Sequence, residues 1–121
     1  MTYFVLGSVA GFLAVALGAF GAHALRDKIP EDRLAVYQTG VQYQMYHAFA
    51  LVVVGILMRM GHSAALSWAG MLFTAGIVLF SGSLYTLAGT GIRKLGAITP
   101  IGGLCFLGGW IALLIGGGSV L

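Results

Sequence analysis

The distribution of charges restricts the fold of this chain more than any other feature. Its six Lys/Arg and three Asp/Glu residues stand in three short segments, at residues 26–33, 59 and 93–94, between long apolar stretches. A helix needs about 20 apolar residues to cross a hydrocarbon core of roughly 30 Å. Only 7% of the residues are charged, which excludes an ordinary soluble domain. The sequence therefore predicts an all-α membrane protein, a four-helix transmembrane bundle with short loops.

The chain is short enough to form a single transmembrane domain over residues 1–121. We expect its helices at about residues 3–25, 35–58, 64–88 and 99–117. The last helix has the clearest start, because Thr99 is a suitable N-cap and Pro100 fits the first helical position, where a missing N–H loses no hydrogen bond. The glycines at 116–118 are expected to end it.

Positive charges are divided unequally between the loops. Loops 26–34 and 89–98 contain Arg26, Lys28, Arg33, Arg93 and Lys94, against Arg59 alone in the remaining loop. Cytoplasmic loops of membrane proteins carry an excess of Lys and Arg. We therefore expect loops 26–34 and 89–98 in the cytoplasm and both termini outside.

Glycines recur along one stripe of the first and last helices. Those at the expected packing positions are Gly7, Gly11, Gly18, Gly21, Gly102 and Gly109. Small residues on one face let two helix backbones approach closely, which is a main source of helix association in lipid. We expect these faces to pack within one bundle; they would also suit a homo-oligomer.

The second helix contains most of the polar residues. Its apolar part, residues 48–58, covers roughly 16 Å and is too short to span the membrane alone. The helix must therefore include the preceding segment with Gln38, Gln42, Gln44 and His47. These side chains point in several directions around a helix, so we expect neighbouring helices on several sides.

Polar residues of the other helices fall toward the same predicted cytoplasmic half. We expect a polar cluster there that receives a small polar molecule or a lipid headgroup. The candidate ligand-binding residues are His23, Gln38, Gln42, Gln44, His47, Tyr85 and Thr99. An ionisable group such as His47 is costly to bury in a membrane and is therefore a functional candidate. The alternative is that these residues join helices through hydrogen bonds of about 0.6 kcal/mol each.

Three functions stay open at this point. The first is non-enzymatic binding or transport through the polar cluster, with membrane lipids or an unidentified small molecule as the ligand. The second is a structural subunit or scaffold that docks a partner through its glycine-rich faces. The third is an enzyme acting on a lipid or quinone, with His47 as acid or base.

Several other chemistries lack the residues they need. No Asp or Glu lies inside an expected span, which disfavours a carboxylate proton relay. His23, His47 and Cys105 have no metal-site spacing, and the two histidines differ in expected depth, which disfavours a haem with two histidine ligands. We therefore predict no metal, no cofactor, no assigned catalytic residue and no nucleic-acid partner.

Four segments carry a family resemblance. They are residues 18–25 (GAFGAHAL), the pairs Tyr43-Gln44 and His47-Ala48, residues 82–85 (GSLY) and residues 98–103 (ITPIGG). In this order they resemble the bacterial YgdD/YwdK family of small inner-membrane proteins, over essentially the whole chain. The resemblance implies a multi-pass protein of the bacterial inner membrane with four spans. That family is a domain of unknown function with a similar small transmembrane protein in eukaryotes, so it supplies no site residues.

Overall fold

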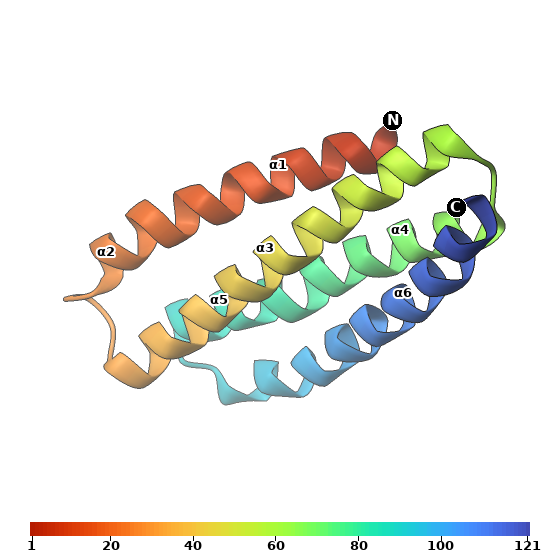
Figure 1. Cartoon of the computed structure of the whole chain (residues 1–121). Coiled ribbons are helices and arrows are strands. Elements are labelled where there is room, and N and C mark those ends of the chain that lie inside the picture. Colours follow the sequence, from red (N-terminus) through yellow and green to blue (C-terminus); the bar gives the residue numbers. More distant parts are fainter.

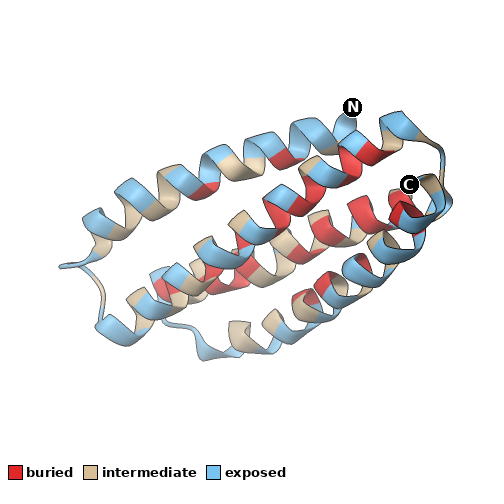
Figure 2. Ribbon diagram, in the orientation of Figure 1, coloured by how far each residue is buried: buried red, intermediate tan, exposed pale blue.

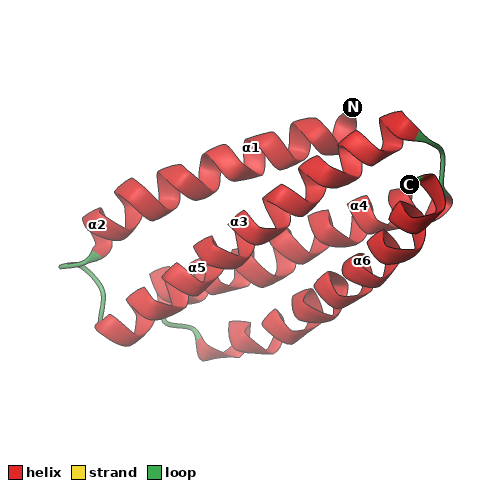
Figure 3. Cartoon of the chain, in the orientation of Figure 1, coloured by secondary structure: helices red, strands yellow, loops and turns green.

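A computed structural model describes all 121 residues. The chain forms four long helices in alternating directions, joined by short loops, with no strand (Figure 1, Figure 3). Each of the four is long and apolar enough to cross a membrane, which confirms the predicted four-helix transmembrane bundle. Both termini lie at the end of the bundle that holds the loop at 61–63 (Figure 1). We call the opposite end, with loops 26–30 and 91–98, the basic end.

The spans are built from six α-helices and three shorter turns. Span one contains α1 (Thr2–Ala16), a π-helical turn (Leu17–Gly21) and α2 (Ala22–Leu25). Span two is α3 (Glu31–Met60). Span three contains α4 (Ala64–Gly76), a second π-helical turn (Ile77–Ser81) and α5 (Gly82–Thr90). A 3-10 turn (Arg93–Ala97) leads into α6 (Thr99–Val120), which forms span four.

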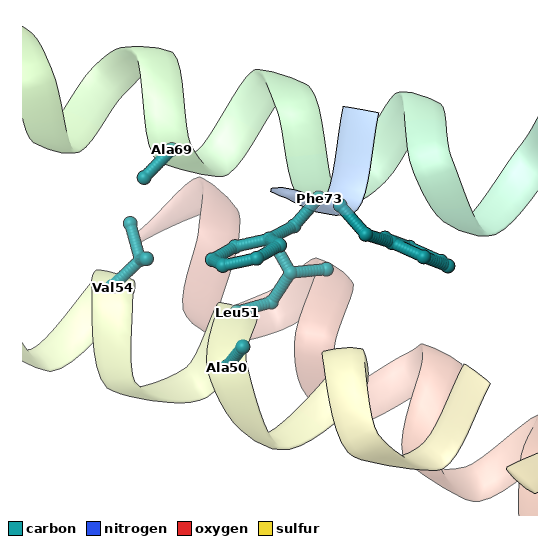
Figure 4. Close-up of a cluster of buried hydrophobic side chains, with 6 residues drawn as sticks. Ala50, Leu51, Val54, Ala69 and Phe73 are labelled. Carbon is teal, nitrogen blue, oxygen red and sulfur yellow. The ribbon is translucent and has the colours of Figure 1, made fainter. Parts of the chain in front are cut away.

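Helix α3 is the centre of the bundle and contacts all three other spans. Buried residues follow it for most of its length, whereas most of α1 is exposed (Figure 2). The main hydrophobic cluster joins α3 to α4 and α6 and consists of Ala50, Leu51, Val54, Ala69, Phe73 and Phe106 (Figure 4). This position accounts for the buried polar residues Gln44 and His47, since the helix has neighbours on several sides.

The start of α3 was predicted four residues too late. The helix begins at Glu31, directly after Pro30, whose ψ of 154° is not helical. Glu31 and Asp32 lie in the first turn, where negative charge interacts favourably with the helix dipole. Their charge made these residues look like part of a loop in the sequence, although the same charge stabilises this helix terminus.

Helix α6 begins at residue 99, as predicted, but its N-cap residue and its C-terminal end differ from the prediction. Ile98 is the N-cap, and Thr99 lies inside the first turn, where its Oγ1 lies 2.7 Å from the Ser83 Oγ. At the other end α6 continues to Val120, because Gly116 and Gly117 pack against Leu66 and Leu57. Tertiary packing thus keeps a glycine-rich turn helical.

The glycines predicted for packing face neighbouring spans of the same chain. Gly7 lies against the α3 backbone, where an added Cβ would be 2.8 Å from the Ala48 carbonyl oxygen. Gly102 lies against the backbone of Phe80, and Gly109 against the ring of Phe73. Gly18 faces Val41, Gly21 faces the Tyr37 hydroxyl, and Gly11 has a looser contact with Ala48.

Candidate functional site

A hydrogen-bond network inside the bundle centres on Gln44. Its Nε2 donates to the Ala10 carbonyl at 2.8 Å, and its Oε1 accepts from the Tyr85 hydroxyl at 2.6 Å. This single side chain therefore joins spans one, two and three. Tyr37 and Ser81 make similar links, because their hydroxyls donate to the Leu17 and Gly40 carbonyls, both at 2.6 Å.

The Tyr37 bond is made at a π-helical turn. The Leu17 carbonyl accepts the N–H of Ala22, five residues further on, as well as the Tyr37 hydroxyl. Such turns are rare, and no residue pattern in the sequence predicted this one. The contact fixes the basic end of span one against α3.

His47 is also held on both ring nitrogens. Its Nδ1 lies 2.6 Å from the Tyr43 carbonyl, which can only accept, so Nδ1 carries the hydrogen. Its Nε2 then accepts from the Trp110 indole N–H at 3.1 Å. The ring stacks on Phe106 with centroids 3.5 Å apart, and only 4% of the residue is exposed. The side chain has no nitrogen free for a ligand.

Gln38 and Gln42 are exposed and belong to a different place. Together with Thr39 they line a polar hollow of about 470 Å³ between α3 and span one, opposite Gly18 and Ala22. The structure therefore separates the predicted ligand residues. Gln44, Tyr85, His47 and Thr99 form hydrogen bonds inside the bundle, Gln38 and Gln42 line an outer hollow, and His23 is exposed near the end of span one.

An apolar hollow of about 590 Å³ lies between the same two helices, farther from the basic end. Gly11, Val15 and Phe20 line it from span one, and Met45 and Phe49 line it from α3. No residue pattern in the sequence predicted this hollow, because its lining residues other than Ser8 are apolar or glycine and are typical of lipid-facing or packing positions.

The two hollows follow one another along the same side of α3. Six of their nine lining residues on α3 recur every three or four positions: Ala35, Gln38, Gln42, Met45, Phe49 and Val52. This spacing places them on one face of the helix. We call the combined feature the α1–α3 groove; it is polar toward the basic end and apolar beyond Met45.

A further cavity of about 340 Å³ separates span one from span three. It includes Gln44, Tyr85 and Thr74, but these groups are already bonded to one another or to backbone. Indeed, no buried side-chain polar atom in the chain lacks a partner. This cavity therefore offers a ligand little beyond apolar contact.

Replacing Gln44 with leucine is expected to lower the free energy of unfolding by about 1–2 kcal/mol, because two interhelical hydrogen bonds are lost. Tyr85→Phe should have roughly half that effect. Gln42→Leu is the matched control and should be nearly neutral, since Gln42 is exposed. Reversible unfolding in mixed detergent micelles measures all three. Equal effects at Gln44 and Gln42 would contradict the network.

The fold and the groove define a small four-span integral membrane protein. Residues 17–103 match the family described as "Protein of unknown function (DUF423)". The chain belongs to this family.

Its relatives carry the same membrane assignment in their names. The chain is 52% identical to UPF0382 membrane protein YwdK of Bacillus subtilis over 114 residues, which cover 93% of both chains. It is 47% identical to UPF0382 membrane protein SH2409 of Staphylococcus haemolyticus, over 93% of this chain and 92% of the relative. No solved structure is significantly similar. The predicted family resemblance is therefore confirmed.

Proposed function

We propose that this protein binds a phospholipid in the α1–α3 groove, with an acyl chain in the apolar part and the headgroup at Gln38 and Gln42. The observation that carries the proposal is that a polar and an apolar hollow follow one another along the same side of α3. Binding of a lipid headgroup was also expected from the sequence. The proposed site, however, lies on the surface of the bundle and not in its interior.

The depth of the groove agrees with a lipid in one leaflet. Helix α3 has 30 residues, roughly 45 Å, and so extends beyond a hydrocarbon core of about 30 Å. With Arg59 at the opposite boundary, the first turns of α3 lie in the headgroup region. From Gln42 to Val52 the groove continues for about 15 Å, which is half of that core.

The polar part is what would distinguish this site from the surrounding bilayer. Lipid tails are as apolar as leucine side chains, so an apolar groove alone retains no particular lipid. Glutamine amides both donate and accept hydrogen bonds, and phospholipid phosphate and ester oxygens are acceptors. Gln38 and Gln42 supply such donors where a headgroup would lie.

The other two functions have less support. A scaffold would need free glycine-rich faces, but Gly7, Gly102 and Gly109 lie against spans of the same chain. An enzyme would need a free acid or base, but both nitrogens of His47 are engaged. As part of the proposal we place the protein in the bacterial inner membrane, with the basic end in the cytoplasm and the termini outside.

The test compares two valines of α1 by native mass spectrometry after gentle solubilisation. Val15 lines the groove, whereas Val5 lines none of the cavities described above; 55% and 51% of these residues are exposed. Val15→Trp fills the apolar part and should reduce bound phospholipid at least tenfold. Val5→Trp should leave it unchanged. A wild-type protein free of lipid, or equal lipid on both folded variants, would refute the proposal.

A further inference from the structure

Span one is held differently at its two ends. At the end with the termini its backbone touches α3 directly, since an added Cβ at Gly55 would lie 2.8 Å from the Phe4 Cα. The Tyr3 ring lies against Gly70 of α4, and the Tyr3 hydroxyl donates to the Ser67 carbonyl at 3.4 Å. The first turns of α1 are therefore clamped between spans two and three.

Toward the basic end the same span is attached more loosely. At Gly18 and Gly21 it meets the side chains of Val41 and Tyr37 and not the α3 backbone. Hollows flank it on both sides: the apolar part of the α1–α3 groove on one side, and the 340 Å³ cavity toward span three on the other. Ala14 is the only buried residue of span one beyond its first two turns.

Two hydrogen bonds attach this part of span one to α3. They are the bond from the Gln44 Nε2 to the Ala10 carbonyl, at 2.8 Å, and the bond from the Tyr37 hydroxyl to the Leu17 carbonyl, at 2.6 Å. Both carbonyls belong to helical turns of span one and keep a backbone partner if the side-chain bond breaks; that of Leu17 accepts the Ala22 N–H. Breaking the two bonds therefore leaves no carbonyl of span one unbonded.

We infer that span one is a gate, hinged at its clamped first turns, whose basic half moves away from α3 when these two bonds break. Opening frees the Gln44 amide and the Tyr37 hydroxyl as hydrogen-bond donors beneath span one. They then face the space next to the cavity toward span three, which offers mainly apolar contact while the gate is closed. The gate thus exposes a polar site inside the bundle, and it does not depend on lipid binding in the α1–α3 groove.

The loop at 26–30 leaves room for this movement. Its five residues could reach about 17 Å when extended. In the closed state the N–H groups of Lys28 and Ile29 both bond to the Leu25 carbonyl, at 2.9 and 3.2 Å, so the loop is coiled. Uncoiling it lets the end of span one move away from the start of α3.

The test measures distances between two spin labels by double electron–electron resonance, on full-length protein in lipid nanodiscs with Cys105→Ser as the background. The basic-end pair is Ala24→Cys with Ile101→Cys, and the control pair at the opposite end is Val5→Cys with Leu114→Cys. All four labelled positions are exposed. The gate predicts a closed and a longer, open distance for the basic-end pair, and a single distance for the control pair.

Removing the two bonds should shift this equilibrium toward the open state. Hydrogen bonds between membrane helices average about 0.6 kcal/mol, so Tyr37→Phe should raise the ratio of open to closed protein about threefold. The double variant Tyr37→Phe, Gln44→Leu should raise it about eightfold. Tyr85→Phe is the matched control, because it loses the bond from Tyr85 to Gln44 but keeps both bonds to span one.

The single Tyr37→Phe variant keeps its ring and preserves the test if the double variant does not fold. An opening that grows from Tyr37→Phe to the double variant, at the basic end alone, would support the gate. Unchanged distances in these variants, equal changes in both label pairs, or the same opening in Tyr85→Phe would overturn it.

Discussion

Replacing Gly102 with alanine is expected to lower the free energy of unfolding by about 1–3 kcal/mol or more. The same change at the adjacent Gly103 should stabilise the bundle slightly. An added Cβ at Gly102 would meet the backbone nitrogen of Phe80 and lie 2.8 Å from its Cα. Backbone atoms cannot rotate away as a flexible side chain can. Helix α6 must therefore move away from span three to make room for the added methyl group. Interiors are close-packed, and such a shift breaks other contacts.

Gly103 is the matched control because nothing lies within 4 Å of an added Cβ there. Both residues are inside α6, where alanine is preferred over glycine by about 0.5–1 kcal/mol. Reversible unfolding in mixed micelles of a mild detergent and SDS, followed by circular dichroism, measures the difference. Similar stabilities for the two variants would show that α6 does not pack on Phe80 in this register.

Replacing His47 with alanine is expected to lower the free energy of unfolding by about 2–4 kcal/mol, the range for truncating a large buried side chain. The change removes the ring stacked on Phe106 and leaves the Trp110 indole without its acceptor. Trp110→Phe keeps an aromatic ring beside Phe73 but loses this hydrogen bond, whose loss should cost about 0.6 kcal/mol. The same unfolding measurement applies to both variants.

This experiment also distinguishes a structural from a functional His47. A ligand-binding histidine could be removed without loss of folding, but the bound molecule would disappear. We expect the reverse: lower stability, with phospholipid still bound to the folded fraction in native mass spectrometry. His23→Ala provides the control, because His23 is exposed and should affect neither quantity. An unchanged stability of His47→Ala would contradict the structural role.

The spans could be predicted from the positions of the charges, whereas some of their boundaries could not. Glu31 and Asp32 look like loop residues in the sequence, yet they form the first turn of α3 because charge is favourable at that terminus. Gly116 and Gly117 look like a helix end, yet packing against Leu66 and Leu57 keeps them helical. In both cases the surroundings outweigh the local preference of the residues.

The candidate site was less predictable than the fold, because it depends on the direction in which each side chain points around its helix. Gln42 and Gln44 are two positions apart, which separates their side chains by about 200°. Gln42 therefore lines the outer groove, whereas Gln44 joins Ala10 to Tyr85 inside the bundle. Because both residues are glutamines, the prediction placed them in one polar cluster, but the structure places them at two different sites.

Four membrane spans follow from this sequence alone, because in lipid every backbone N–H and C=O must be bonded internally and a long apolar run meets that demand as a helix. The sequence could not establish which neighbours surround α3, and that arrangement determines the roles of its polar residues. With three spans packed around it, α3 buries Gln44 and His47 in satisfied hydrogen bonds. It leaves Gln38 and Gln42 exposed beside span one, where the groove begins, because those side chains face away from the core.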